Sequence, residues 1–420
     1  MVTIPDLFNR QSTPDMTKIH LLAAIAASLL AGCGQQEKAT ETPPDLQDEA
    51  GRIARSSIIV DTHVDVPYRL EDTPADVSQA TDSGDFDYPR AVAGGLNAPF
   101  MSIYTPAELE AAGGSFALAE SLIDMVEAIV AASPDKFAIA LSPADVRAQF
   151  EGGLISFPLG MENGSPIEGD LKNLQHFFDR GIRYITLAHG LSNHISDSSY
   201  DENRQWNGLS EFGVEVVKEM NRLGIMVDIS HVSDDAFWQA AEVSTAPLIA
   251  SHSSARFFTP GFERNMSDDM IKRLAETGGV IMINYGSAFL TADANKYSMA
   301  AFAARDIWKE DKPELSDHEA SEQFKVIWEA EHGLLPYADI NDVLDHIDHV
   351  VELTGIDHVG IGSDYDGVGD SLPAGLKDVS SYPNLVKGLL KRGYSEQDIR
   401  KILGGNLLRV WQVVADHATR

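Results

Sequence analysis

The chain has 420 residues, 44% of them hydrophobic and 23% charged, enough for one large or two ordinary globular domains with an ample core. Its formal net charge of −32 argues against nucleic acid as a partner, because a phosphate backbone is bound by lysine and arginine. Its single cysteine, Cys33, excludes an intrachain disulfide.

A signal-peptide pattern lies near the amino terminus. An apolar run from Leu21 to Ala31 follows Lys18, and Cys33 comes soon after it. The run is shorter than the roughly 20 residues that cross a bilayer, and a short basic start, an apolar run and small residues are typical of a signal peptide. The stretch LLAGC also resembles the lipobox of bacterial lipoproteins, whose cysteine carries the lipid; an ordinary secretory signal and a chance apolar helix are the alternatives.

This pattern divides the chain into three parts. We expect residues 1–33 to hold an upstream extension and the lipoprotein signal, residues 34–54 to be a polar flexible tether, and residues 55–420 to form the folded domain. A lipid on Cys33 would anchor the protein in a bacterial cell envelope, facing the periplasm. Retention of such lipoproteins in the inner membrane usually needs an aspartate after the cysteine, so Gly34 implies the outer membrane.

Beyond residue 55, eight short apolar runs alternate with stretches of helical pattern. Continuous apolar strands indicate a parallel sheet that is buried on both faces. Eight strand–helix repeats over this length predict an α/β fold, a (β/α)8 TIM-like barrel with insertions. The runs cover residues 57–63, 98–104, 153–162, 183–189, 225–231, 247–252, 279–285 and 358–364.

Helical patterns lie between several of these runs, for example at residues 169–181 and 208–224. Ser233 and Ser267 each precede two aspartates and a helical pattern, which predicts a capping serine and acids in the first turn of a helix. Residues 286–340 are the longest insertion and contain no clear strand. We expect this insertion to be helical and to cover the site.

Polar side chains suited to metal binding stand at the carboxyl ends of the predicted strands, where the active sites of such barrels lie. A single histidine there is more often a satisfied core group, but four together are not explained by packing. Histidine and carboxylate suit zinc or a similar divalent ion, and this set exceeds what one tetrahedral ion needs. The strand-end residues are His63, Asp65, Tyr104, Glu162, His189, His231, His252, Tyr285 and Asp364.

The strand-end residues predict hydrolysis assisted by two metal ions. Residues i and i+2 of an extended strand share one face, so His63 and Asp65 point to one place. Glu162 has two carboxylate oxygens and could bridge two ions, which would share one hydroxide and polarise a carbonyl. A serine-based triad is the alternative mechanism, but the G-x-S-x-G pattern occurs nowhere in the chain.

Seven longer stretches occur in order over roughly residues 55–415: DTHVD, GMENG, RYITLAHGLSN, GLSEFGVEVVKEMNRLGIMVDISHVS, APLIASHSSAR, RNMSDDMI and VGIGSDYDGV. In these stretches the chain resembles the membrane (renal) dipeptidase family of zinc peptidases. The family fold is a metal-dependent (β/α)8 barrel, which agrees with the predicted strands.

The resemblance implies two zinc ions and assigns their ligands. His63 and Asp65 match the ligands of the first zinc, and Glu162 matches the carboxylate that bridges the two ions. His231 and His252 match the ligands of the second zinc. Manganese or cobalt at the same ligands is the alternative to zinc.

The resemblance also implies substrate-binding residues. His189 matches a residue near the substrate and the transition-state oxyanion, and Arg264 matches the arginine that receives the substrate carboxylate. Tyr104, at the end of its strand, is expected beside the substrate. A planar guanidinium suits a free carboxylate, and requiring that carboxylate would make the enzyme a dipeptidase and not an endopeptidase.

The remaining assignments have alternatives. Asp364 matches the acid/base that handles the proton of the leaving amine, and Asp366, two residues on, is the alternative. The spacing before Arg264 is one residue longer than in the mammalian enzymes, so Arg256 is the alternative carboxylate-binding residue. Asn163 stands where many members have glycine, and we expect it to affect the loop, since glycine adopts positive φ more easily.

The predicted function is zinc-dependent hydrolysis of small dipeptides, including those with a C-terminal D-residue. One alternative is a related metal-dependent amidohydrolase that acts on another amide or ester; several of these would have a carboxylated lysine where this chain has Glu162. The other alternative is a non-catalytic periplasmic lipoprotein. Relatives are often dimers, and the resemblance therefore implies a homodimer.

Overall fold

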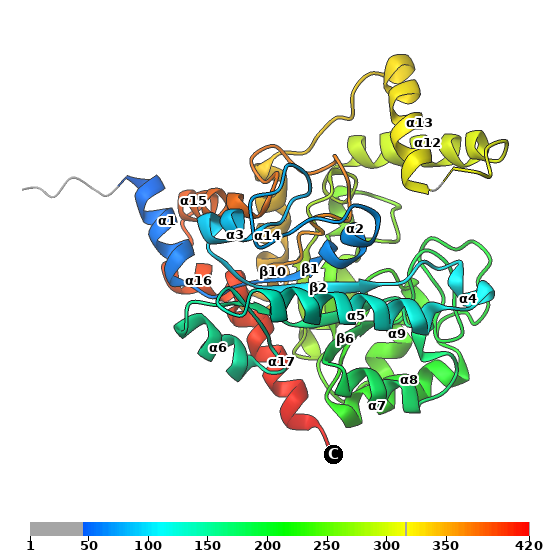
Figure 1. Ribbon diagram of the computed structural model, residues 1–420, viewed down its shortest axis with the longest axis horizontal. Coiled ribbons are helices and arrows are strands. Elements are labelled where there is room, and N and C mark those ends of the chain that lie inside the picture. The colour runs from blue at the N-terminus through cyan, green and yellow to red at the C-terminus, as the bar shows by residue number, and fades with distance from the viewer. Residues whose placement is uncertain (1–44, 316, 420) are drawn as a thin grey trace, which may run out of the picture. The chain divides into compact units, whose positions relative to one another are not determined.

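The computed structural model describes residues 45–315 and 317–419 of the chain. Its centre is a closed barrel of parallel strands in the order β1-β10-β9-β8-β7-β6-β5-β2, seen edge-on in Figure 1. Each of the eight predicted apolar runs supplies one barrel strand, so the predicted (β/α)8 fold is confirmed. The barrel strands are β1 Ile59–Val64, β2 Leu96–Tyr104, β5 Leu159–Glu162, β6 Ile182–Thr186, β7 Met226–Asp228, β8 Ile249–Ser253, β9 Val280–Ile283 and β10 Val359–Ile361.

One predicted run is two strands and has a partner that the sequence pattern did not indicate. The run at residues 153–162 contains β4 Ile155–Phe157 and then β5, with Pro158 between them. Pro158 has no amide hydrogen to donate, which separates the two ladders. β4 pairs in parallel with β3, Phe137–Ile139, in a small separate sheet. A strand as short as β3 carries too few residues for a recognisable period.

Helices surround the barrel strands (Figure 1). The predicted serine caps are confirmed: Ser233 accepts a hydrogen bond from the amide of Ala236, and Ser267 from that of Met270. The helices are α1 Leu46–Ser56, α2 Val66–Asp72, α3 Tyr88–Gly94, α4 Leu109–Ala112, α5 Ser115–Ala132, α6 Pro143–Glu151, α7 Lys172–Asp179, α8 Glu211–Leu223, α9 Asp234–Val243, α10 Asp268–Glu276, α11 Ser287–Leu290, α12 Ala292–Lys309, α13 Asp317–His332, α14 Ile340–Thr354, α15 Tyr382–Lys391, α16 Glu396–Arg400 and α17 Asn406–His417.

The last helix, α17, closes the amino-terminal end of the barrel. One buried cluster joins Trp411 and its neighbours on α17 to residues from the starts of several strands, such as Met226 and Val280. The Trp411 ring packs against Phe100, with ring centroids 5.3 Å apart, and Phe100 packs against Tyr184 at 5.4 Å. A site inside the barrel therefore has to form at the carboxyl ends of the strands.

The amino-terminal boundary differs from the predicted one. The tether was expected to extend to residue 54, but α1 starts at Leu46 and packs against α15. Asp45 caps this helix, and Ala50, Ile53 and Ala54 are fully buried. Acidic and polar residues separate these few apolar positions, so the segment looked uniformly polar although it has the period of an amphipathic helix. This explains why the predicted boundary of the folded domain was wrong. The signal pattern, Cys33 and most of the tether lie outside the described residues.

The insertion at residues 286–340 is helical, as expected, and forms α11, α12 and α13. Figure 1 shows α12 and α13 standing apart from the helices that surround the barrel. Asn295 and Met299 of α12 line a hollow together with loop residues that include Tyr200 and Phe262, so α12 borders part of the barrel mouth. Among the described helices, none combines the length and the apolar character needed to cross a bilayer.

A buried histidine on α14 connects the end of α11 with the loop that follows β8. The Nδ1 atom of His346 accepts a hydrogen bond from the amide of Ala255 at 3.0 Å, and its Nε2 atom donates to the carbonyl of Leu290 at 3.0 Å. Burial, aided by the nearby charge of His349, lowers the pKa of His346 to about 4. The folded protein therefore holds His346 neutral.

We expect part of the stability to be lost as the pH falls from about 6.5 to about 4. Between these two pH values the unfolded chain binds a proton at His346 and the folded chain does not. The free energy of unfolding therefore decreases as the pH decreases. The difference between the usual pKa of 6.5 and 4 corresponds to about 3 kcal/mol. Denaturant unfolding of wild type and His346→Gln at pH 7 and 4.5 measures it. An equal loss in both proteins would contradict this assignment.

Candidate metal centre

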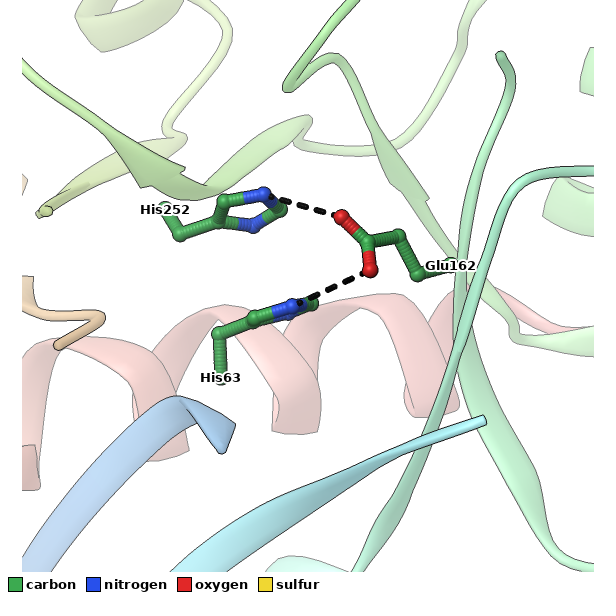
Figure 2. Close-up of side chains that lie close together, drawn as sticks. All are labelled: His63, Glu162 and His252. Carbon is green, nitrogen blue, oxygen red and sulfur yellow. Dashed lines mark ion pairs between the residues drawn. The ribbon is translucent and has the colours of Figure 1, made fainter. Parts of the chain in front are cut away.

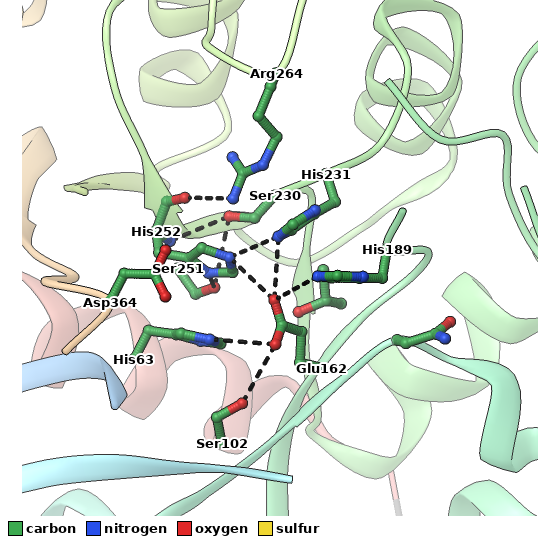
Figure 3. Close-up of polar contacts among 12 residues, drawn as sticks. His63, Ser102, Glu162, His189, Ser230, His231, Ser251, His252, Arg264 and Asp364 are labelled. Carbon is green, nitrogen blue, oxygen red and sulfur yellow. Dashed lines mark hydrogen bonds and ion pairs between the residues drawn. The ribbon is translucent and has the colours of Figure 1, made fainter. Parts of the chain in front are cut away.

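Glu162, the last residue of β5, lies at the centre of the polar residues in the barrel mouth (Figure 3). Its Oε1 atom is 3.1 Å from Nε2 of His231, 3.2 Å from Nε2 of His252 and 3.5 Å from Nε2 of His189. Its Oε2 atom is 3.4 Å from Nε2 of His63. One buried carboxylate thus meets four imidazoles, and all four histidines predicted at strand ends are brought together.

The two oxygens of Glu162 face different histidines, as Figure 2 shows for His63 and His252. Asp65, which follows β1, extends the cluster on the His63 side, with Oδ2 3.4 Å from Nε2 of His63. The potential ligand atoms form three groups, and the atoms within each group all lie within 4.8 Å of one another. They are His63 with Glu162 and His252, Glu162 with His189 and His231, and His63 with Asp65 and Asp364.

His63 is held in the tautomer that leaves Nε2 free to bind a metal. The hydroxyl of Tyr184 donates to the carbonyl of Thr62 at 3.0 Å, so it accepts from Nδ1–H of His63 at 2.8 Å. The hydrogen is then on Nδ1, and Nε2 of His63 carries a lone pair. This buried atom has no hydrogen-bond partner among the described residues. An unpaired buried acceptor needs a partner, and a nitrogen lone pair of this kind fits a metal ligand.

His252 is oriented in the same way by a different chain of hydrogen bonds. The hydroxyl of Ser251 donates to Oδ2 of Asp228 at 2.6 Å and therefore accepts from Nδ1–H of His252 at 2.8 Å. Asp228 is fully buried and also accepts from the amide of Ser251 at 2.8 Å. Nε2 of His252 consequently presents a lone pair toward Glu162. Hydrogen-bond partners of this kind are typical behind metal-binding histidines.

His231 completes the convergence. Its Nε2 atom is only 2.8 Å from Nε2 of His252. Because the lone pair of His252 points into this space, a proton or a metal ion has to lie between the two rings for the contact to be favourable. Burial lowers the pKa of both histidines well below the usual range, so the neutral, metal-binding form is favoured.

The electrostatics of the centre favour a positive charge. Burial by itself would raise the pKa of Glu162, but His63, His189 and their neighbours hold it well below its usual range. Burial also opposes protonation of His63, yet Tyr184 and the carboxylates of Asp65 and Glu162 raise its pKa well above the usual value. A divalent ion would supply the same positive charge, so the residues present fit a metal site.

Asp364 faces the cluster from the end of β10. Asn284 donates to its Oδ2 atom at 2.7 Å, and its backbone has a positive φ of 64°. A Cβ atom on Gly367 would lie 2.2 Å from Oδ2 of Asp65 and 2.3 Å from Oδ1 of Asp364. Glycine is therefore needed at this position for the two carboxylates to lie side by side. Burial raises the pKa of Asp364 to about 7.

Asp366 points away from the cluster. Its Oδ2 atom accepts from Nε of Arg69 at 2.9 Å, and its Oδ1 atom accepts from the amide of Asp85 at 2.6 Å. A second hydrogen bond joins the same two residues, since the amide of Asp366 donates to Oδ2 of Asp85 at 2.9 Å. The carboxylate of Asp366 is thus committed to holding two loops together, while that of Asp364 remains at the metal centre.

The two candidate arginines also differ in direction. Arg264 is 3% exposed and lies beside the histidines of the centre (Figure 3). It donates to Oγ of Ser253 at 2.7 Å and to the carbonyl of His252 at 2.8 Å. Its Nε atom has no partner among the described residues. Arg256 instead forms two hydrogen bonds with the carboxylate of Asp234, at 2.5 and 2.7 Å. Arg264 therefore retains donor capacity beside the centre.

Tyr104, the last residue of β2, and Asn163, which follows β5, lie beside the cluster. The ring of Tyr104 at the end of β2 packs edge-on against His189, with centroids 4.7 Å apart. Asn163 adopts φ of 77°, a value that glycine reaches more easily, as expected from its replacement of glycine. Its side chain compensates by donating to the carbonyl of Thr105 at 2.9 Å and accepting from Asn193 at 2.9 Å.

Several supporting residues were not identified from the sequence. Tyr184 lies inside β6 and Asp228 is the last residue of β7, and neither has a spacing relation to the histidine that it orients. Asn284, which binds Asp364, directly follows β9. The sequence pattern had indicated its neighbour Tyr285 as the strand-end residue. The signal that could have found Asp228 is a charged residue within an otherwise apolar strand, which needs buried partners.

Known proteins resemble the chain over nearly its whole folded part. A family model described as membrane dipeptidase (peptidase family M19) matches residues 47–420. The probable dipeptidase PvdM from Pseudomonas aeruginosa has a similar structure, with 27% identity, a TM-score of 0.78, and coverage of 90% of this chain and 100% of that chain. Another similar structure is a metallo peptidase from Rhodobacter sphaeroides, liganded with a phosphinate mimic of the dipeptide L-Ala-D-Ala. It has 26% identity and a TM-score of 0.69, and the match covers 85% of this chain and 99% of that chain.

Removing the hydroxyl of Tyr184 should weaken metal binding. We expect Tyr184→Phe to lower the affinity for Zn²⁺ roughly 10- to 100-fold, because His63 loses the acceptor that fixes its tautomer. Competition with a chelator measures the affinity. Tyr297→Phe is the matched control, since the Tyr297 hydroxyl bonds the carbonyl of Gly333 in the insertion. Equal affinities for Tyr184→Phe and the control would show that Tyr184 does not orient a ligand.

Proposed function

The chain belongs to the membrane dipeptidase family, peptidase family M19, and is a metallo-dipeptidase, and we propose that it uses two zinc ions to cleave dipeptides, including those with a C-terminal D-residue. The observation that carries this proposal is the convergence of four histidines on the two oxygens of Glu162 at the barrel mouth. The Rhodobacter sphaeroides relative with a phosphinate mimic of L-Ala-D-Ala supports tolerance of a D-residue.

We propose that Glu162 bridges the two ions. His63 and Asp65 would hold one ion with one oxygen of Glu162, and His231 and His252 would hold the other ion with the second oxygen. The separate histidines on Oε2 and Oε1 support this division. When bound, the ions would lower the pKa of a shared water and polarise the scissile carbonyl.

We assign recognition of the substrate carboxylate to Arg264. A guanidinium binds a carboxylate through paired N–H donors, and this one is buried beside the centre with Nε unpaired. The alternative, Arg256, has its donors occupied by Asp234 and by the carbonyl of Asn265. Because Arg264 touches residues at the metal centre, a carboxylate on it can belong only to a residue next to the scissile bond. This limits the substrate to dipeptides.

We assign proton transfer to Asp364 and oxyanion binding to His189. Asn284 binds Oδ2 of Asp364, so Oδ1 is the atom available to accept a proton from the attacking water and return it to the leaving amine. Burial lowers the pKa of His189, which keeps the ring neutral. With Tyr104 packed against it, His189 is positioned to donate a hydrogen bond to the developing oxyanion.

We also propose that a lipid on Cys33 anchors the enzyme to the outer membrane on its periplasmic side. The support is the LLAGC stretch and the glycine at position 34. Recovery of the full chain in the soluble fraction of broken cells would contradict it. A homodimer stays a prediction.

Metal removal is the first test of the proposed function. We expect protein that begins after Cys33 to cleave L-Ala-L-Ala and L-Ala-D-Ala, to lose both activities with a chelator, and to regain them with Zn²⁺. Release of alanine measures the rates. Failure of metal-loaded protein to cleave either dipeptide would favour another amide or ester as substrate, or a non-catalytic protein.

Loss of the proposed carboxylate contact should appear in the KM. We expect Arg264→Ala to raise the KM for L-Ala-L-Ala by about 100-fold, the loss of roughly 3 kcal/mol from charged hydrogen bonds, while metal content stays the same. Steady-state kinetics and metal analysis measure the two effects. An unchanged KM in Arg264→Ala together with a raised KM in Arg256→Ala would move the carboxylate site to Arg256.

A further inference from the structure

A hollow of about 680 Å³ lies beside the metal centre. Two loops, at residues 199–204 and 260–263, form most of its wall, and α12 of the long insertion completes it. The residues that matter for its chemistry are Tyr200, Asp201, Glu202, Phe262, Glu263 and Met299. None of them belongs to the proposed set of metal ligands.

The hollow begins where the carboxyl end of the substrate would be. The ring of Tyr200 has its centroid 6.0 Å from that of His231 and 6.0 Å from that of Phe262, so it lies between the metal centre and the hollow. Glu263 immediately precedes Arg264 in the chain. A residue whose carboxylate is bound by Arg264 would therefore have its side chain close to the hollow.

The hollow is acidic. Asp201, Glu202 and Glu263 contribute three carboxylates against the single guanidinium of Arg204. The charge of Glu263 is already matched, because Arg204 donates to its Oε2 atom at 2.6 Å. The carboxylate of Asp201 accepts from the amides of Ser192 and Asn203, at 3.0 and 2.8 Å, and the nearby charge of Arg204 also stabilises it.

Glu202 is the carboxylate that a ligand can reach. It is exposed, and no cationic side chain pairs with it in the part of the chain that the structure describes. The aromatic rings of Tyr200 and Phe262 and the thioether of Met299 offer apolar contact nearby. Apolar walls that end at an unmatched carboxylate suit a long aliphatic side chain with a positive end.

We propose that this hollow receives the side chain of the C-terminal residue of the dipeptide and selects lysine or arginine there. The inference rests on the proposed dipeptidase function and adds the substrate class. Met299 stands on α12, so the long insertion contributes directly to this selection. Asn295, one turn earlier, is fixed by its hydrogen bond to the carbonyl of Ala288 at 3.0 Å, which holds the start of α12 at the wall.

The test compares L-Ala-L-Lys, L-Ala-L-Leu and L-Ala-L-Ala as substrates of the zinc-loaded enzyme. We expect wild type to have at least a tenfold higher kcat/KM for L-Ala-L-Lys than for L-Ala-L-Leu. In Glu202→Gln this ratio should fall three- to tenfold, because an exposed charge pair contributes a modest energy. Raising the salt concentration from 0.05 to 0.5 M should lower the wild-type ratio as well.

Controls separate this inference from the proposed function. Glu211→Gln removes one exposed carboxylate from the first turn of α8 and should leave the ratio unchanged. Met299→Trp, which fills the hollow, should lower kcat/KM for both larger dipeptides relative to L-Ala-L-Ala. Cleavage of L-Ala-L-Ala with no preference for lysine, or with a ratio that Glu202→Gln does not change, would overturn this inference alone. No cleavage of any dipeptide would overturn the proposed function and this inference with it.

Discussion

The barrel mouth is organised around one buried negative charge, the carboxylate of Glu162. A buried carboxylate is costly unless it is paired, and burial favours the neutral form of two of its imidazole neighbours, His231 and His252. These two neutral rings add no positive charge, but with a metal ion between them and the carboxylate they become its ligands. The arrangement is therefore stable with a cation bound, and metal binding and the integrity of the barrel mouth depend on each other.

The support for this arrangement extends from the closed end of the barrel to the open end. Trp411 of α17 packs on Phe100, Phe100 packs on Tyr184, and the hydroxyl of Tyr184 sets the tautomer of His63. Gly160 makes room for this chain of contacts, because a Cβ atom there would lie 2.0 Å from the Tyr184 ring. Core packing and ligand orientation are thus performed by the same residues, and a change in the core is expected to alter the affinity for metal.

Unfavourable backbone conformations are concentrated at the site. Among the described residues, those other than glycine with positive φ are few, and they include Asn163, His231 and Asp364. Such conformations cost about 1–3 kcal/mol each and persist where surrounding contacts enforce them. The hydrogen bonds of the Asn163 side chain, and the two hydrogen bonds between Asp366 and Asp85, supply those contacts. The loops that carry the predicted catalytic residues are held in place by neighbouring loops and not by their own local preferences.

The sequence by itself determined the barrel and the residues at its mouth. Apolar runs with polar ends reveal parallel strands, and a closed parallel barrel necessarily gathers those ends, so His63, Glu162 and His252 could be expected to meet. Only the tertiary structure decided which of two nearby candidates faces the centre, as for Asp364 and Asp366 or Arg264 and Arg256. The direction of a side chain in a loop depends on partners far away in the chain, such as Arg69 for Asp366 and Asp234 for Arg256. For the same reason the roles of Tyr184 and Asp228 were hidden: they act through contacts between strands, and no local pattern encodes such contacts.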